Sequence, residues 1–237
     1  ASSEIAETAF NPKDDIENVL DTIEQRIFNI SQRSITQKFT HVKDELHAAY
    51  ERFEKLHRGE GQLRGVPTGF QELDNILSGL QRSDLIIVGA RPSLGKTSFV
   101  LDMARHIAVK HNEPVGLFSL EMSREQVIDR LISAEAGVPL WKLRTGRVKN
   151  DADFELVRNA LDTLSRTPMF IDDTPSPNIL QMRSMGRRLQ MEHGLSLIIV
   201  DYLQLMQPRT SSDNMVQQIT EISRGLKGLA RELNVPV

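Results

Sequence analysis

Apolar residues in the first quarter of the chain recur every three or four positions, which is the spacing of one face of an α-helix. The pattern predicts an amphipathic helix over about residues 13–30 and a second over about residues 34–58. The first stripe consists of Ile16, Val19, Leu20, Ile23, Ile27 and Ile30. The second stripe alternates steps of four and three, as in a packed helix or a short coiled-coil seam. We therefore assign residues 1–62 to a linker region with amphipathic helices.

Beyond a turn-rich joint at residues 64–69, the pattern changes to short apolar runs separated by amphipathic stretches of helical length. The runs predict strands at 85–88, 115–120, 169–171, 197–200 and from 235 onward. The stretches between them predict helices near 96–111, 124–136, 152–164, 179–193 and 216–233. Apolar strands without alternation indicate a parallel sheet covered on both faces, so residues 63–237 are predicted to form an α/β domain. Because Val237 falls inside an expected strand, we expect this domain to be truncated there.

Composition narrows the class of protein further. The chain has 237 residues, of which 39% are hydrophobic, enough for one sizeable core. No apolar run approaches the length of a bilayer, and the amino terminus is polar and acidic, so we expect a soluble cytoplasmic protein without membrane contact. The absence of cysteine excludes disulfides and cysteine-ligated zinc. A formal net charge of -3 gives no general basic field, so any contact with DNA must come from local patches or from parts that this sequence does not include.

A glycine-containing loop stands between the predicted strand at 85–88 and the predicted helix that follows it. Its residues are Ala90, Arg91, Pro92, Ser93, Leu94, Gly95, Lys96 and Thr97, with Ser98 next. This is the P-loop pattern with alanine in place of the first glycine, and such a loop wraps backbone N–H groups around phosphates at a helix amino terminus. We expect Lys96 to bridge the outer phosphates of ATP and Thr97 to offer its hydroxyl to Mg²⁺. The strand before the loop and the helix after it argue against a chance match.

Two carboxylates follow predicted strands and should meet at one edge of the sheet. Asp201 ends the apolar run at 197–200, and the carboxyl ends of parallel strands line the ligand crevice, so Asp201 can reach the metal through its water shell. Glu121 follows the run at 115–120 and could orient or deprotonate the attacking water. The alternatives are that Asp201 is a cap or surface-turn residue and that Glu121 only caps the helix beginning near Ser123.

Other charged residues are weaker candidates. Asp172 and Asp173 also end a predicted strand, but prolines follow closely, so a turn is preferred. A basic stretch on the predicted helix at 179–193 is interpreted as a solvated face rather than a DNA groove. Its residues are Arg183, Arg187 and Arg188. Arg209, in the polar loop after Asp201, is the better DNA-binding candidate, because loops that leave this sheet edge could face the channel of a ring.

Four strings taken together resemble the DnaB-type replicative helicases, and the resemblance extends over about residues 14–237. The strings are Gly89 to Thr97, Phe118 to Met122, Val200 to Met206, and Glu221 to Lys227 followed by Asn234 to Val237. The resemblance implies a RecA-like P-loop NTPase core in which Lys96, Thr97 and Asp201 hold MgATP and Glu121 is the catalytic carboxylate.

The same resemblance implies an assembly and its partners. The family forms homohexameric rings that travel along single-stranded DNA, and its members work with primase and a helicase loader. The helix at 14–30 is similar to the linker helix that docks on a neighbouring subunit. The sequence lacks the family's amino-terminal collar and the region after Val237, where the family keeps a polar sensor, much of its DNA-contacting surface and a basic finger.

Two other functions stay open at this point. A RecA-like recombinase, or another ATPase of the RecA fold, has the same two nucleotide motifs, although the linker helix and the Phe118 to Met122 string favour a helicase. A chain without the basic finger could also bind nucleotide and partners without hydrolysing anything.

Overall fold

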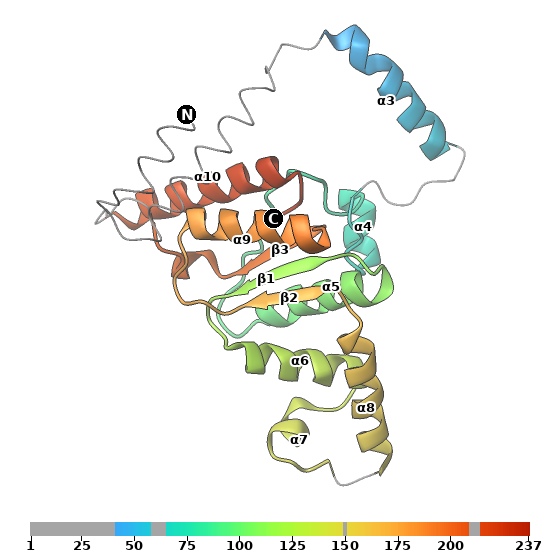
Figure 1. Cartoon of the computed structure of the whole chain (residues 1–237), viewed down its shortest axis with the longest axis vertical. Helices are drawn as coiled ribbons and strands as arrows, with labels where there is room; N and C mark the ends of the chain where they lie inside the picture. Colours follow the sequence, from blue (N-terminus) through green and yellow to red (C-terminus); the bar gives the residue numbers. More distant parts are fainter. Residues whose placement is uncertain (1–40, 58–64, 149–150, 209–213) are drawn as a thin grey trace, which may run out of the picture. The chain divides into compact units, whose positions relative to one another are not determined.

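The computed structural model describes residues 41–57, 65–148, 151–208 and 214–237. The chain divides into two compact units, Ala1–Gly61 and Gln62–Val237, which we describe one at a time. In the first unit, the described element is helix α3, Val42–His57 (Figure 1). The helix predicted at 13–30, and residues 34–40 of the second predicted helix, lie outside the described residues.

Helix α3 begins later than the apolar pattern predicts. His41 is not helical, and its Nδ1 accepts a hydrogen bond from the backbone N–H of Lys43 at 3.1 Å. A side chain that accepts a hydrogen bond from the first turn marks the start of a helix, as N-cap residues do. The prediction of a helix running through His41 was therefore wrong. Val42, Leu46 and Phe53 of the predicted stripe lie in the helix and are exposed.

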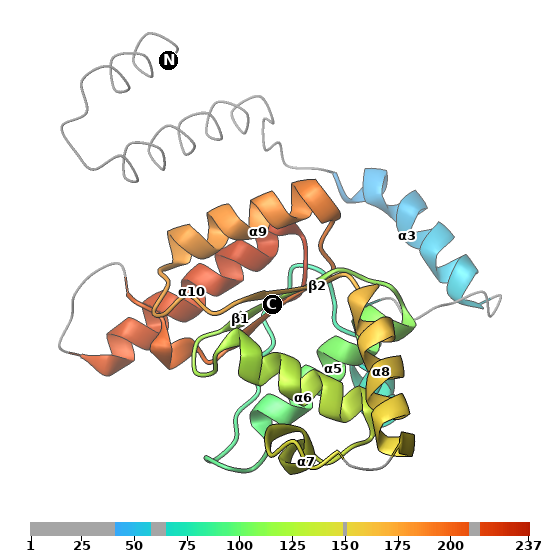
Figure 2. The ribbon, with the colours of Figure 1, turned by 60° about the horizontal axis from the view of Figure 1, so that its bottom comes forward.

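The second unit is built on a parallel sheet of three strands in the order β2-β1-β3 (Figure 1). The strands are β1 Val115–Ser119, β2 Met169–Asp172 and β3 Leu197–Asp201. Val115 pairs with Met169 on one side and with Leu197 on the other, and Ser119 pairs with Asp201. Figure 2 shows helices on both sides of this sheet, which is why its strands are apolar without alternation. The α/β fold predicted from the sequence is confirmed.

The helices of the second unit agree closely with the sequence pattern. They are α4 Gln71–Leu77, α5 Lys96–Lys110, α6 Arg124–Ala136, α7 Leu140–Arg144, α8 Asp151–Ser165, α9 Ile179–His193 and α10 Met215–Leu233, with a 3₁₀ turn, η1, at Leu203–Leu205. The short elements α4, α7 and η1 were not predicted, because a helical period does not show in so few residues. Within the described ranges, no helix is both long enough and apolar enough to span a membrane.

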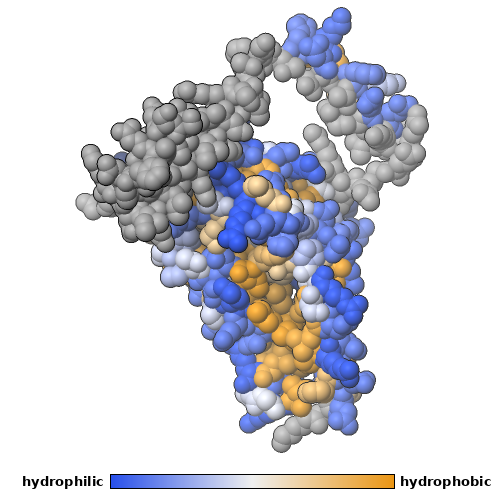
Figure 3. Space-filling model, in the orientation of Figure 1, coloured by the Kyte–Doolittle hydropathy of each residue, from blue (hydrophilic) through white to orange (hydrophobic). Residues whose placement is uncertain are grey.

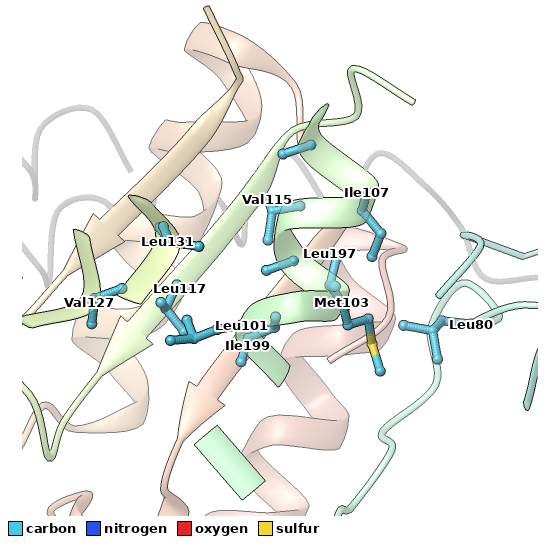
Figure 4. Close-up of a cluster of buried hydrophobic side chains, with 12 residues drawn as sticks. Leu80, Leu101, Met103, Ile107, Val115, Leu117, Val127, Leu131, Leu197 and Ile199 are labelled. Atoms are coloured by element: carbon cyan, nitrogen blue, oxygen red, sulfur yellow. The ribbon is translucent and has the colours of Figure 1, made fainter. Parts of the chain in front are cut away.

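Two buried clusters hold the helices to the sheet. On one face, Leu101 and Ile107 of α5 pack with Leu117 of β1 and Ile199 of β3 (Figure 4). On the other face, Ile198 of β3 packs among side chains of α9 and α10. Successive residues of a strand point to opposite faces, so neighbouring positions of β3 serve different layers. This double anchoring fixes the carboxyl ends of the strands, where the candidate site lies.

Two predicted strands, at 85–88 and from 235 onward, are not formed. The N–H of Ile86 donates to the carbonyl of Val237, and the N–H of Val237 donates to the carbonyl of Asp84, both at 2.8 Å. The carbonyl of Pro236 also accepts from the N–H of Ile198 in β3 at 3.1 Å, but these few hydrogen bonds do not make either segment a strand. Ile87 and Val88 are consequently 63% and 39% exposed, where a central strand would bury them.

The basic stretch on α9 is also not the solvated face that its sequence suggests. The Nε atoms of Arg183 and Arg187 lie 3.0 and 2.6 Å from the two carboxylate oxygens of Glu232 on α10. These three side chains are mostly buried, whereas Arg188 is exposed and pairs with Glu192 one turn further along α9. Arg183 and Arg187 therefore join α9 to α10 instead of facing water.

A lobe formed by α6, α7 and α8 carries exposed apolar side chains, and Figure 3 shows apolar surface running over this part of the unit. The large ones are Ile128, Trp141, Phe154, Leu156 and Leu161. Contiguous apolar surface of this kind commonly marks a site of contact with another chain.

Candidate nucleotide-binding site

The loop from Gly89 to Thr97 leads directly into α5, whose N-cap is Gly95. Gly95 has a φ of 87°, a left-handed conformation that glycine adopts without steric cost. No side chain caps this helix, whereas α6 and α9 both begin with a capping box. The first N–H groups of a helix have no partner inside it, and a helix start of this kind suits an anionic ligand. Ala90, Arg91, Pro92, Ser93 and Leu94 form the exposed rim of the loop.

Thr97 and Asp201, which are 104 residues apart in the sequence, meet at this helix start. The Thr97 hydroxyl donates a hydrogen bond to Oδ2 of Asp201 at 2.7 Å. Asp201 is the last residue of β3 and is only 6% exposed. A buried carboxylate needs polar partners, and hydroxyl and carboxylate oxygens are the ligands that Mg²⁺ prefers. The pair predicted from the sequence as a magnesium site is thus brought together, and its donor atoms suit that metal.

Lys96 points to an aromatic ring that the sequence analysis gave no role. Its Nζ lies 4.4 Å from the centroid of the Tyr202 ring, within the range of a cation–π interaction. Tyr202 follows Asp201 directly, so the same strand end presents both the carboxylate and the ring. An aromatic residue next to the strand-end aspartate is the signal that could have identified it.

Glu121 lies two residues beyond the end of β1, in the turn between β1 and α6. Because Ser119 pairs with Asp201 in the sheet, this turn leaves the same edge that carries Asp201. The N-cap of α6 is Ser123, whose hydroxyl accepts from the N–H of Gln126, so Glu121 is not the cap. Glu121 is exposed at the sheet edge and does not cap α6.

Ser98, in the first turn of α5, is contacted by a residue that the sequence analysis did not single out. Nη1 of Arg130 on α6 lies 3.4 Å from the Ser98 hydroxyl oxygen, and Nε of Arg130 is buried with no hydrogen-bond partner among the residues that the structure describes. No sequence signal separates Arg130 from the other basic residues on helix surfaces. The predicted DNA-binding candidate Arg209 lies outside the described residues.

A cavity of about 510 Å³ opens beside the loop. Its lining includes Gly89, Ala90, Lys96 and Asp201, together with apolar side chains of the segment at 85–88, of β3, of α4 and of α5. Within the described part of the chain, no cluster of three or more histidine or acidic side chains could hold a metal by itself. Thr97 and Asp201 do not form such a cluster by themselves.

A parallel sheet, a phosphate-binding loop before a helix and a strand-end aspartate define a P-loop NTPase with a RecA-like core. Residues 65–237 match the family of the DnaB-like helicase C terminal domain, and the chain belongs to this family. The resemblance drawn from the motifs is confirmed at this level.

Relatives match along the whole chain. It is 45% identical over 237 residues to the replicative DNA helicase DnaB of Geobacillus stearothermophilus, covering 100% of this chain and 52% of that protein. It is 44% identical to the replicative DNA helicase DnaC of Bacillus subtilis (strain 168), covering 98% and 51%. The chain thus spans about half the length of the curated relatives it matches.

Two solved structures share the fold. One, described as an ATPase domain, superposes with a TM-score of 0.78 at 32% identity, covering 84% of this chain and 70% of that one. A DnaB-like replicative helicase, whose structure was reported with its interactions with primase, gives a TM-score of 0.74 at 29% identity, covering 100% and 56%. The same architecture therefore occurs in an ATPase domain and in a replicative helicase.

Proposed function

We propose that this chain is the motor part of a replicative DNA helicase, in which a homohexameric ring couples ATP hydrolysis to movement along single-stranded DNA and to unwinding of the duplex. The observation that carries the proposal is the 2.7 Å contact between Thr97 and Asp201 at an uncapped helix start. It stands in a chain whose full-length relatives are named replicative helicases. That similarity favours a helicase over a recombinase with the same motifs.

The residues of the loop would bind the phosphates of ATP. The N–H groups at the start of α5 would donate to the phosphate oxygens, and Lys96, which now lies at the Tyr202 ring, would contact the outer phosphates. Thr97 and Asp201 would hold Mg²⁺, Asp201 through water, and the metal when bound offsets the negative charge of the phosphates.

Glu121 would act on the water that attacks the terminal phosphate. Its turn leaves the sheet edge next to Asp201, so its carboxylate is available to accept a proton from that water. If Glu121 accepts this proton, bound ATP is hydrolysed; without a proton acceptor here, the site would only bind nucleotide.

The partners we propose follow from the family. They are single-stranded DNA, further copies of the same chain, primase and a helicase loader. A relative of the same fold is described with its interactions with primase. Arg209 stays our candidate for DNA contact, since it follows the strand end that carries Asp201.

The proposed function is tested by ATP hydrolysis measured with and without single-stranded DNA, on the protein that contains this chain in its full length. We expect hydrolysis that depends on Mg²⁺ and rises when single-stranded DNA is added. Nucleotide binding without turnover under both conditions would instead support a binding and assembly role.

We predict that the helix at 14–30, which lies outside the described residues, buries its apolar face on another subunit. Burying four side chains of its stripe at about 1.5–3 kcal/mol each gives roughly 6–12 kcal/mol before costs. Association and ordering cost at least about 4 kcal/mol, so assembly through this helix alone should be weak and concentration-dependent. Sedimentation of the chain with a non-hydrolysable ATP analogue should show assembly that rises with concentration.

A version of the chain that starts at Ser31 is the control for this prediction. It should remain monomeric over the same concentrations. If both versions stay monomeric, or both assemble equally well, the helix is not the contact between subunits. Exposed apolar side chains on the lobe of α6, α7 and α8 offer one surface for such a contact.

A further inference from the structure

The turn that carries Glu121 is fastened to its surroundings on both sides. Before Glu121, the N–H of Leu120 donates to the carbonyl of Asp201 at 2.8 Å. After it, the hydroxyl of Ser119 donates to the carbonyl of Met122 at 2.8 Å. These contacts tie the turn to β1 and β3, and the remaining anchor comes from the end of β2.

That anchor is Asp173, the residue after β2. Its Oδ2 accepts a hydrogen bond from the backbone N–H of Arg124, and its Oδ1 accepts one from Nη2 of the Arg124 guanidinium, both at 2.9 Å. The backbone N–H of Arg124, and then its guanidinium, hold the pKa of Asp173 below its ordinary value. Asp172, just before it, is bonded to Thr174 through the backbone N–H and the hydroxyl, which fixes the local turn. The carboxylate of Asp173 is therefore presented to α6 by an ordered segment.

Stabilising the start of α6 accounts for only part of this contact, because Asp173 accepts from the N–H of Arg124, a first-turn donor that the helix's own cap leaves unsatisfied. Helix α6 already has a complete capping box, in which Ser123 and Gln126 satisfy each other's backbone N–H groups. Arg124 is the first residue of the helix, three positions after Glu121. What Asp173 adds is a connection between the Glu121 turn and the neighbouring strand β2.

We propose that Asp173 is a positioning residue that sets the placement of Glu121 through the backbone of Arg124. The inference rests on the proposed role of Glu121 in hydrolysis. Catalytic groups must be held to within about 0.5 Å of their working geometry, and a misplacement of about 1 Å can cost on the order of 10²-fold in rate. With Asp173 in place, strands β1, β2 and β3 all constrain the turn between β1 and α6.

The test is steady-state ATP hydrolysis by the full-length protein with variants of the two partners. Asp173→Ala should lower kcat by roughly 10- to 100-fold, with KM for ATP and the Kd of MgATP near wild type. Arg124→Gln removes only the exposed ion pair and should stay close to wild type. Arg124→Pro deletes the N–H that Asp173 accepts, at the first helical position where proline is well tolerated. It should therefore reproduce the loss seen in Asp173→Ala, and the double variant should lose no more than either.

Asp162→Asn is the control, since Asp162 is an exposed acid on α8 that pairs with Arg166, the residue after that helix. It should leave kcat unchanged. A folded Arg124→Pro or Asp173→Ala protein with wild-type kcat would overturn the inference, and Arg124→Pro decides alone if Asp173→Ala does not fold. Glu121→Gln, measured in parallel, separates the two claims. If that variant is inactive while Arg124→Pro is fully active, only the positioning role fails, whereas an active Glu121→Gln protein removes the proposed role of Glu121 itself.

Discussion

Replacing Lys96 by alanine is expected to weaken MgATP binding by roughly 10- to 150-fold. Charge-assisted contacts to phosphate contribute about 1.5–3 kcal/mol each, and each 1.4 kcal/mol is about tenfold in affinity. Lys96 is the first residue of α5, and its ammonium lies over the Tyr202 ring beside the Asp201 strand end. The effect is measured by equilibrium titration of the chain with MgATP.

Lys110→Ala is the control, because Lys110 lies in the last turn of the same helix. At about 1.5 Å per residue, the two lysines are roughly 20 Å apart along α5. Lys110→Ala should bind MgATP as the wild type does. Undiminished binding by Lys96→Ala would show that nucleotide binds elsewhere and that the P-loop assignment is mistaken.

Replacing Glu121 by glutamine in the full-length protein is expected to keep nucleotide binding and to lower the hydrolysis rate by roughly 10²–10⁴-fold. The amide keeps the shape of the side chain but does not accept a proton from water. Since Ser123 caps α6, the change leaves the helix start intact. Rates are compared at saturating MgATP, and binding is checked by titration.

Glu155→Gln, an exposed acid on α8, makes the same change of charge away from the site and should leave the rate unaltered. A Glu121→Gln protein that hydrolyses ATP at nearly the wild-type rate would reduce Glu121 to an ordinary turn residue.

Local pattern was enough to predict most of the fold and the pairing at the centre of the site. Strand β3 is an unbroken apolar run that ends at Asp201. The helix that begins after Gly95 shows a clear helical period of apolar residues. Thr97 and Asp201, which are in contact, could therefore both be predicted to lie at one edge of the sheet. The prediction of a strand at 85–88 was wrong because strand formation depends on a paired neighbour, and among the described residues this segment's backbone hydrogen bonds to the end of the chain are the two between Asp84, Ile86 and Val237.

The pattern of hydrophobic and polar positions could not predict contacts between segments that are distant in the sequence. Asp173 was expected in a turn, and it does follow β2 directly, but its hydrogen bonds to Arg124 depend on where α6 begins in space. The ion pairs of Arg183 and Arg187 with Glu232 turn an apparent basic face into a junction between helices. Such pairs join residues far apart in the sequence, so the periodic pattern of apolar positions could not indicate them.

The central claim, that this edge of the sheet binds MgATP, is tested most directly by an experimental structure of the chain with Mg²⁺ and a non-hydrolysable ATP analogue. We expect the phosphates on the N–H groups at the start of α5, Lys96 moved from the Tyr202 ring to the outer phosphates, and the metal beside Thr97 and Asp201. Nucleotide bound away from the loop at 89–97, or bound there with no metal near Thr97 and Asp201, would contradict the account.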